Sequence, residues 1–255
     1  MLLLKNTLNI ELQAISTRFF NAFSAQDKQT NTDMGFGWLE EELIVAKLAL
    51  FPANSGAVYI DFLSGKKNHR RQFGGGKGQP LARAVGLKSG KTPSIVDATA
   101  GMGGDAFVLA TLGCKVLMVE RSPIISVLLK DALERGLQSL DAELLSDIQN
   151  LSLINADSTE YLLAQRPSVD VIYMDPMYPE KKKKAAVKKE MLALQNLVGP
   201  DLDSEKLLAT ALQVAKKRVV VKRPAKAPII ELDNHKPTMS IKSPNTRYDV
   251  YLCQN

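Results

Sequence analysis

The sequence is poor in the residues that build disulfide-linked and metal-stabilised scaffolds. It has two cysteines, Cys114 and Cys253, and two histidines, His69 and His235, among 255 residues. So few cysteines exclude a disulfide scaffold and a cysteine-rich zinc site, and they favour a reducing compartment such as the cytoplasm. Two histidines do not make a metal-binding constellation, so we expect no metal.

Long apolar runs are also missing. No stretch reaches the ~18 consecutive apolar residues of a membrane-spanning helix. The apolar residues 1–4 are followed at once by Lys5, so we expect no signal-peptide core. Hydrophobic residues form 45% and charged residues 24% of the chain, which are ordinary globular values. The length of 255 residues predicts one large domain, or one domain with a small appendage.

Acidic residues are absent from three basic segments. Between Asp61 and Asp97 the chain carries eight bases and no acid, and residues 181–189 and 216–226 are basic and acid-free as well. Neutralisation of phosphates dominates affinity for nucleic acids, so three such segments favour a polyanionic partner. The alternative is three solvated faces that never meet in the folded chain.

What the chain does contain after Pro93 is a regular alternation of strand-like and helix-like segments. This alternation predicts an α/β fold in which helices flank a mostly parallel sheet. We expect this α/β domain at residues 91–255 and a small N-terminal α+β domain at residues 1–90. The predicted strands are residues 94–97, 115–120, 151–155, 169–174, 218–222 and 247–252, and the predicted helices are 105–112, 123–136, 158–165, 188–197 and 204–215.

The N-terminal part is less regular. Apolar spacing predicts a helix over residues 8–24, and β-branched and aromatic content predicts a strand over 57–62. Residues 38–50 fit either a helix or a pair of strands. A basic, glycine-rich loop at residues 64–78 precedes a short predicted helix at 79–86.

The first predicted strand of the α/β domain runs into a glycine-rich turn at residues 97–105. A strand, a glycine turn and a helix let backbone N–H groups approach a ligand closely, although the pattern here is not a complete pyrophosphate fingerprint. Glu120 ends the next strand, 23 residues after Asp97. An acid at that place can accept hydrogen bonds from both hydroxyls of a ribose; a solvated strand end is the alternative.

The third predicted strand ends at Asp157 and Ser158. The Asp157 carboxylate can accept from an adenine amino group, and either residue can cap the following helix. The two roles are compatible with each other.

The fourth predicted strand ends in Asp175-Pro-Met-Tyr-Pro179, the most specific segment of the chain. It resembles the Asp/Asn-Pro-Pro-Tyr/Phe tetrapeptide of methyltransferases that modify exocyclic amines of bases, with Met177 in place of the second proline. Acceptors at the Asp175 carboxylate and the Pro176 carbonyl would orient the poorly nucleophilic lone pair of such an amine. The ring of Tyr178 would stack on a flipped base.

Several segments together resemble the small-subunit ribosomal RNA guanine-N2 methyltransferase J family. The resemblance covers about residues 55–252. It implies a Rossmann-like methyltransferase fold, S-adenosylmethionine as the cofactor, and one guanosine of bacterial small-subunit rRNA as the substrate. Gly104 stands where many relatives are expected to have an arginine. The segments are residues 69–76, 97–103, 119–121, 175–179 and 221–224.

The turn and the resemblance together give a set of expected site residues. Catalytic roles are expected for Asp175, Pro176 and Tyr178. Lys222 and Arg223 could meet substrate phosphate, or form a strand-end salt bridge. Arg70 and Arg71 are expected at RNA phosphates, or else as partners of the acidic residues 40–42. The expected cofactor contacts are Asp97, Gly101, Gly103, Gly104, Asp105, Glu120, Arg121, Asp157, Ser158 and Asp175, and the expected RNA contacts are Arg70, Arg71, Phe73, Lys77, Lys222 and Arg223.

The leading functional hypothesis is therefore a cytoplasmic RNA guanine-N2 methyltransferase that acts on small-subunit rRNA or on the assembled subunit. The tetrapeptide alone also fits a DNA adenine-N6 methyltransferase. A non-catalytic RNA-binding assembly factor is a third possibility, against which Gly101, Glu120 and Asp175 argue. The incomplete glycine pattern disfavours a nicotinamide-dependent oxidoreductase.

Overall fold

The structure, a computed structural model, describes residues 35–39, 47–51, 57–63, 76–88, 91–177, 203–232 and 235–253. The chain divides into two compact units, the first formed by Met1–Ile60 with Lys184–Val198 and the second by Asp61–Lys183 with Gly199–Asn255. In the first unit, β1 (Gly35–Leu39) pairs antiparallel with β2 (Lys47–Phe51). The domain boundary expected at residue 90 stays a prediction.

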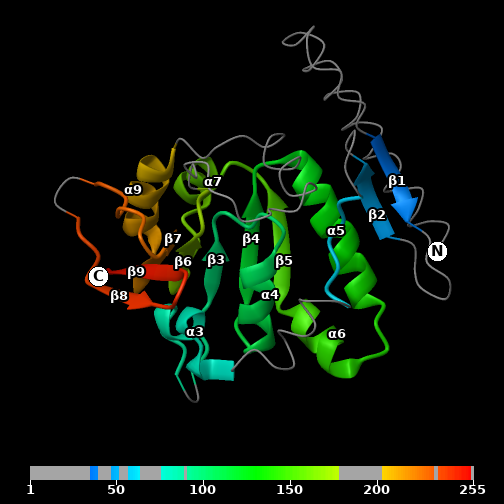
Figure 1. The fold of residues 1–255 in the computed structure, drawn as a ribbon, viewed down its shortest axis with the longest axis horizontal. Helices are drawn as coiled ribbons and strands as arrows, with labels where there is room; N and C mark the ends of the chain where they lie inside the picture. The colour runs from blue at the N-terminus through cyan, green and yellow to red at the C-terminus, as the bar shows by residue number, and fades with distance from the viewer. Residues whose placement is uncertain are drawn as a thin grey trace, which may run out of the picture. The chain divides into compact units, whose positions relative to one another are not determined.

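The second unit is built on a seven-stranded sheet with the neighbour order β5-β4-β3-β6-β7-β9-β8 (Figure 1). The five strands from β5 to β7 run parallel, and β9 runs antiparallel to both of its neighbours. The prediction of a mostly parallel sheet is confirmed. The strands are β3 (Ile95–Asp97), β4 (Val116–Glu120), β5 (Leu151–Asn155), β6 (Val171–Met174), β7 (Arg218–Pro224), β8 (Met239–Lys242) and β9 (Thr246–Leu252).

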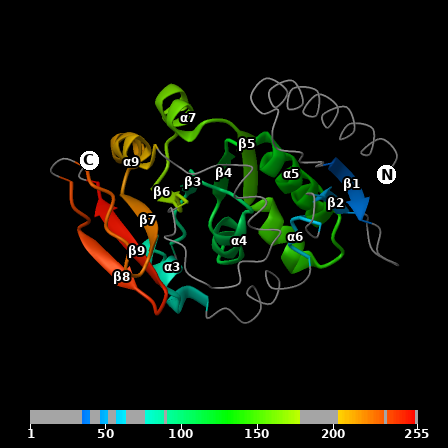
Figure 2. The ribbon, with the colours of Figure 1, turned by 45° about the horizontal axis from the view of Figure 1, so that its top comes forward.

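Helices cover both faces of this sheet. Figure 2 shows α7 and α9 together on one face and α4 on the other, where α6 packs against both α4 and α5. Among the described residues, no helix is long and apolar enough to cross a membrane. The helices are α3 (Pro80–Ala84), which follows a 3-10 turn at Gly76–Gly78, α4 (Gly104–Thr111), α5 (Pro123–Leu137), α6 (Ala142–Gln149), α7 (Ser158–Gln165) and α9 (Ser204–Val214).

Local chemistry explains where the central helices begin. Ser122 caps α5 by accepting a hydrogen bond from the Ile125 N–H, and Pro123 occupies the first turn, where its missing N–H costs nothing. Asp157 caps α7 by accepting from the Glu160 N–H. The buried faces of α7 and α9 pack on β-branched residues of the sheet, a core that includes Val96, Val119, Leu162, Ile172, Leu208 and Val219.

The structure also departs from the sequence-based expectations. The ambiguous residues 38–50 contribute to the strand pair of β1 and β2. The strand predicted over residues 57–62 is wrong: of these residues only Val58 pairs, in a single bridge to Leu50. Its β-branched and aromatic residues suit a pleated surface, but a strand also needs a partner along its length. Helix α6 and strand β8 were not predicted, and the helices predicted at 8–24 and 188–197 lie outside the described residues.

Candidate functional site

The glycine turn after β3 contains one position that only glycine can occupy without strain. Gly103 caps α4 with φ of 69°, in the left-handed region. A Cβ added there would lie 2.9 Å from Leu129 Cδ2 and 3.2 Å from Phe62 Cζ. At Gly104, by contrast, a Cβ would meet nothing within 4 Å. The turn therefore packs tightly on its inner side and leaves open space beside Gly104, where a ligand can approach the backbone.

Glu120 joins this turn to the end of β4. Its Oε2 accepts from the Gly101 N–H at 2.8 Å and its Oε1 from the Ser122 N–H at 2.7 Å. The side chain is 5% exposed. Glu120 is thus a buried acceptor that organises two backbone segments. Each of its oxygens can accept more than one hydrogen bond, so this arrangement is compatible with the predicted ribose contact.

Asp97 lies deeper, at the end of β3. Its carboxylate accepts from the Thr99 N–H at 3.2 Å, and the residue is 2% exposed. Burial raises the pKa of Asp97 to about 8, with a smaller contribution from the nearby carboxylates of Asp105, Asp175 and Glu120. The Asp97 carboxyl group, held mostly neutral, therefore stabilises the glycine turn through its hydrogen bond with the Thr99 N–H.

Asp175 directly follows β6, at the same edge of the sheet. Its backbone N–H donates to the Thr99 hydroxyl, which ties the start of the Asp175-Pro-Met-Tyr-Pro179 segment to the turn after β3. Pro176 is buried, and the Asp175 side chain is 40% exposed. Tyr178 lies outside the described residues. The parallel pairing of β3 with β6 brings Asp97 and Asp175 together, as expected for the carboxyl ends of neighbouring strands.

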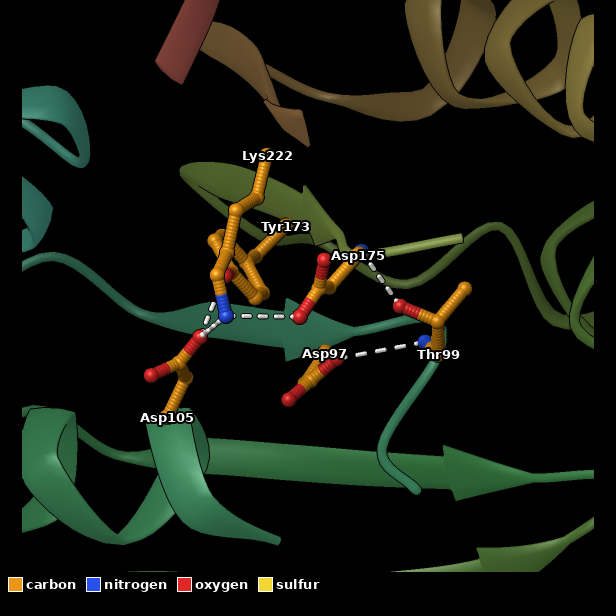
Figure 3. Close-up of polar contacts among 6 residues, drawn as sticks. All are labelled: Asp97, Thr99, Asp105, Tyr173, Asp175 and Lys222. Atoms are coloured by element: carbon orange, nitrogen blue, oxygen red, sulfur yellow. Dashed lines mark hydrogen bonds and ion pairs between the residues drawn. The ribbon is translucent and has the colours of Figure 1, made fainter. Parts of the chain in front are cut away.

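An ammonium group links Asp175 to the first turn of α4. Figure 3 shows Lys222 Nζ between the two carboxylates, 2.7 Å from Asp175 Oδ2 and 2.8 Å from Asp105 Oδ2. The buried Tyr173 hydroxyl donates to the same Asp105 oxygen at 2.6 Å. Burial by itself lowers the pKa of Lys222, but attraction to Asp105 and Asp175 outweighs it and raises the pKa above its ordinary value. Lys222 is therefore a fixed cation.

The remaining predicted cofactor residues lie along the ends of β4 and β5. Asp157 caps α7, which is the structural role that the sequence left open for it, and the Ser158 hydroxyl donates to the Ala98 carbonyl at 2.6 Å. Arg121 is exposed and forms an ion pair with Asp203 at 3.2 Å. All three residues lie at the edge where Glu120 ends β4, and their part in cofactor binding stays a prediction.

Of the predicted RNA-binding residues the structure describes Lys77, Lys222 and Arg223, and these three lie in different surroundings. Lys77 lies near Cys114. Burial raises the pKa of the Cys114 thiol to about 11, and the charge of the nearby Lys77 ammonium opposes that shift. Because Cys114 precedes β4, Lys77 lies toward the amino end of that strand, opposite Glu120. Arg223 is buried and donates to the Pro228 carbonyl. Lys222 contacts carboxylates, while Arg70, Arg71 and Phe73 lie outside the described residues.

The sequence does not single out two residues of the site, Thr99 and Tyr173. Thr99 sits inside the glycine-rich segment, where its hydroxyl was not assigned a task, and Tyr173 sits in a buried apolar strand. A tyrosine in such a strand is a usable signal, since a buried phenol hydroxyl usually finds a hydrogen-bond partner. The partner itself, Asp105, is 68 residues away and becomes visible only in the fold.

Comparison with known proteins shows the family to which the chain belongs. The family described as "Putative SAM-dependent methyltransferase" matches residues 22–253. A protein of Hydrogenovibrio crunogenus named ribosomal RNA small subunit methyltransferase J is 67% identical over 206 residues, which are 80% of this chain and 73% of that one. A Shewanella amazonensis protein of the same name is 47% identical over 89% of this chain and 90% of its own. The chain belongs to the ribosomal RNA small subunit methyltransferase J family.

A solved structure agrees with the methyltransferase J assignment. A SAM-dependent methyltransferase from Neisseria gonorrhoeae superposes with a TM-score of 0.65 at 32% identity, covering 88% of this chain and 85% of that chain. The Rossmann-like methyltransferase fold predicted from the sequence is thereby confirmed. The family is SAM-dependent, so S-adenosylmethionine is its methyl donor.

The residues of this methyltransferase J family member fit such a cofactor. Open space lies beside Gly104, and the Glu120 carboxylate binds the Gly101 N–H of the same glycine turn. These are the groups that suit the polar parts of a nucleoside. Among the described residues, no group of three or more histidine, cysteine or acidic side chains is arranged to hold a metal ion.

Proposed function

We propose that the protein transfers a methyl group from S-adenosylmethionine to the exocyclic N2 of a guanosine in bacterial small-subunit (16S) rRNA. One observation carries the proposal: Asp175, which opens a segment typical of amine methyltransferases, lies at the same sheet edge as the glycine turn and Glu120. The names of the relatives support RNA of the small ribosomal subunit as the substrate.

The cofactor side of the site is assigned to the ends of β3, β4 and β5. The glycine turn of Gly101, Gly103 and Gly104 is assigned to the cofactor, which would approach the backbone through the open space beside Gly104, and Asp97 supports the turn. Glu120 accepts from the ribose hydroxyls. Contacts beyond the ribose are assigned to Asp105, Arg121, Asp157 and Ser158, of which Asp157 receives the adenine amino group.

The substrate side is assigned to the segment after β6. The lone pair of an aromatic amine is delocalised into its ring, which makes the amine a weak nucleophile. The Asp175 carboxylate and the Pro176 carbonyl accept its two hydrogens, so the nitrogen pyramidalises and its lone pair is directed along one line. Proline fixes φ and so holds that carbonyl in place. Tyr178 provides the stacking face for the base.

S-adenosylmethionine, when bound there, would supply a methyl group on a sulfonium sulfur, and that sulfur would keep the electron pair of the C–S bond as a neutral thioether. The N2 lone pair forms the new C–N bond, and N2 becomes cationic. Its proton then passes to Asp175 or to water. The protein's contribution is orientation and charge stabilisation, because the amine need not lose a proton before it attacks.

The RNA side of the proposal rests on the basic segments and on the relatives' names. Arg70, Arg71 and Lys77 are assigned to phosphates and Phe73 to stacking on a base. We infer that the substrate is small-subunit rRNA, either free or in the assembled subunit, and that the protein works in the cytoplasm where that RNA is found.

The proposal is tested with small subunits and free 16S rRNA from a strain that lacks its own methyltransferase J. Purified protein and labelled S-adenosylmethionine are expected to yield N2-methylguanosine at one position, read by mass spectrometry of nucleosides. A parallel reaction contains DNA, and methylated adenine in that DNA would support the DNA adenine-N6 alternative instead. Cofactor binding without any transfer to either nucleic acid would support a non-catalytic assembly factor.

The RNA-binding assignment has its own test at Arg70 and Arg71. Changing both to alanine should raise the RNA Michaelis constant and lower the salt slope of RNA binding by about one unit for each lost phosphate contact. Affinity for S-adenosylmethionine should not change. If the two arginines instead pair with the acidic residues 40–42, the double variant should melt at a lower temperature with a wild-type salt slope.

A further inference from the structure

Strands β6 and β7 carry an aspartate–lysine pair at each end. The two strands are parallel, with Val171 opposite Arg218 and Met174 opposite Val221. One position before this ladder Lys217 contacts Asp170 at 2.8 Å, and one position after it Lys222 contacts Asp175 at 2.7 Å. The same register thus produces two ion pairs of nearly the same length, one at each end of the two strands.

The two lysines differ in what else they contact. The Lys217 side chain is 63% exposed, and the one ion pair that the structure gives it within the described residues is to Asp170. Lys222 is 26% exposed and bridges carboxylates from two elements, Asp175 after β6 and Asp105 in α4 (Figure 3). Tyr173 fixes the bridged oxygen of Asp105 with a third contact.

This network determines how the Asp175 carboxylate is oriented. Lys222 holds its Oδ2, and Thr99 holds the backbone N–H of the same residue. Two fixed points restrict rotation of the side chain and so set the direction of its lone pairs. An acceptor with a fixed direction loses little freedom when it binds an amine, which is how a preorganised group accelerates a reaction.

We propose that Lys222 is a positioning residue for methyl transfer: held in place by Asp105 and Tyr173, it orients the Asp175 carboxylate toward the amino group of the substrate base. The inference rests on the proposed function and deepens it. In this proposal Lys222 does not contact RNA phosphate, as the sequence had led us to expect, because its ammonium group is already bound by two carboxylates.

The test compares Lys222→Met with the matched control Lys217→Met, which removes an ion pair of nearly the same length at the other end of the same strands. Lys222→Met should lower kcat about 10- to 100-fold, the range expected when a reacting group is misplaced by about 1 Å. Affinity for S-adenosylmethionine and the salt slope of RNA binding should stay near wild type. Lys217→Met should keep the wild-type kcat. Lys222→Arg, which preserves the charge and can still bridge carboxylates, should recover part of the loss.

Two outcomes would overturn the inference. A phosphate-binding Lys222 predicts an unchanged kcat, a higher RNA Michaelis constant and a salt slope lower by about one unit. A purely structural Lys222 predicts a lower melting temperature with wild-type kcat for the folded fraction. Should Lys222→Met fail to fold, Tyr173→Phe decides: it leaves both ion pairs and removes one contact to Asp105, so a smaller loss of kcat is expected, and an unchanged kcat refutes the inference.

Failure of this inference is distinguishable from failure of the proposed function. The methylated nucleoside made by the wild-type protein tests the function. The ratio of variant to wild-type turnover tests Lys222, and it is meaningful for any base whose exocyclic amine is the acceptor.

Discussion

The two ends of strands β6 and β7 resemble each other in geometry and differ in environment. At the amino end, Asp170 accepts from Lys217 and from the Ser94 N–H, and contact with Lys217 lowers the pKa of Asp170 despite some burial. At the carboxyl end, Lys222 forms ion pairs with both Asp105 and Asp175. Burial raises the pKa of the nearby Asp97 to about 8.

The difference shows which end is built for stability. At the amino end, Asp170 and Lys217 pair with each other and both remain partly exposed to water, so forming the pair costs little desolvation free energy. At the carboxyl end, burial raises the pKa of Asp97, and the charges of the nearby Asp105, Asp175 and Glu120 carboxylates add a smaller shift in the same direction. Crowding of like charges is unfavourable for folding and is common where a protein binds or reacts with a ligand.

The strongest way to break this comparison is to remove the aspartate at each end. Asp175→Ala should lower methyl-transfer turnover about 10²- to 10³-fold, the typical value of a single preorganised group. Asp170→Ala should keep turnover near wild type. Single-turnover rates with saturating S-adenosylmethionine and RNA measure both. An Asp175→Ala protein that retains more than about a tenth of wild-type turnover would show that the assigned role is wrong.

The next largest effect is expected at Glu120. Glu120→Ala should weaken S-adenosylmethionine binding about 10- to 100-fold, since hydrogen bonds to a charged group are worth about 1.5–3 kcal/mol. Turnover at saturation should not change, because the ribose is bound alike in the ground and transition states. Calorimetry provides the dissociation constant. The melting temperature should also fall, since the Gly101 and Ser122 N–H groups lose their acceptor.

Glu120 has an alternative role that the same measurement would reveal. A dissociation constant equal to wild type, together with the lower melting temperature, would assign Glu120 a structural role alone. The comparison of the two sheet edges would then rest on Asp175 and Lys222.

Asp97 should make stability depend on pH in the direction opposite to Asp170. Between about pH 4 and pH 8 the folded protein keeps a proton on Asp97 that the unfolded chain has lost. This contribution to the free energy of unfolding therefore falls as the pH rises, by up to about 1.4 kcal/mol per pH unit, and levels off above pH 8. The contribution of Asp170 is full above the unfolded pKa of aspartate and is lost as the pH falls through its lowered folded pKa.

Asp97→Asn isolates this pH dependence. The variant cannot titrate at residue 97, so its free energy of unfolding relative to wild type should rise with pH up to about pH 8. Urea unfolding of both proteins at several pH values measures the difference. Parallel curves across this range would mean that the folded protein holds Asp97 ionised.

The smallest effect is expected for the amino-end pair. Lys217→Met should change the free energy of unfolding by about 0–1 kcal/mol, as is usual for an exposed ion pair, and added salt should reduce the difference. Urea unfolding at low and high salt measures it. A loss well above that range would show that the pair anchors β6 and β7 more firmly than its exposure indicates.

The amino-acid sequence by itself determined most of the elements of the α/β domain and their order, with α6 and β8 as the exceptions. Strands β4, β5 and β6 and helices α5 and α7 lie within a few residues of their predicted bounds, because apolar periodicity, Ser122, Pro123 and Asp157 are local signals. The glycine turn, Glu120 and Asp175 could be placed at one edge of a sheet for the same reason, since parallel strands share a carboxyl end.

Only the tertiary structure decided what the basic residues in β7 and directly before it do. Lys217, Lys222 and Arg223 belong to one acid-free run in the sequence, yet one forms an exposed pair, one bridges two carboxylates and one is buried. The register of β7 on β6 sets these environments, and α4 supplies Asp105 from 117 residues away in the chain. Charge acts through space over a few ångströms, so neighbours that are distant in sequence determine whether a lysine faces RNA, water or a carboxylate.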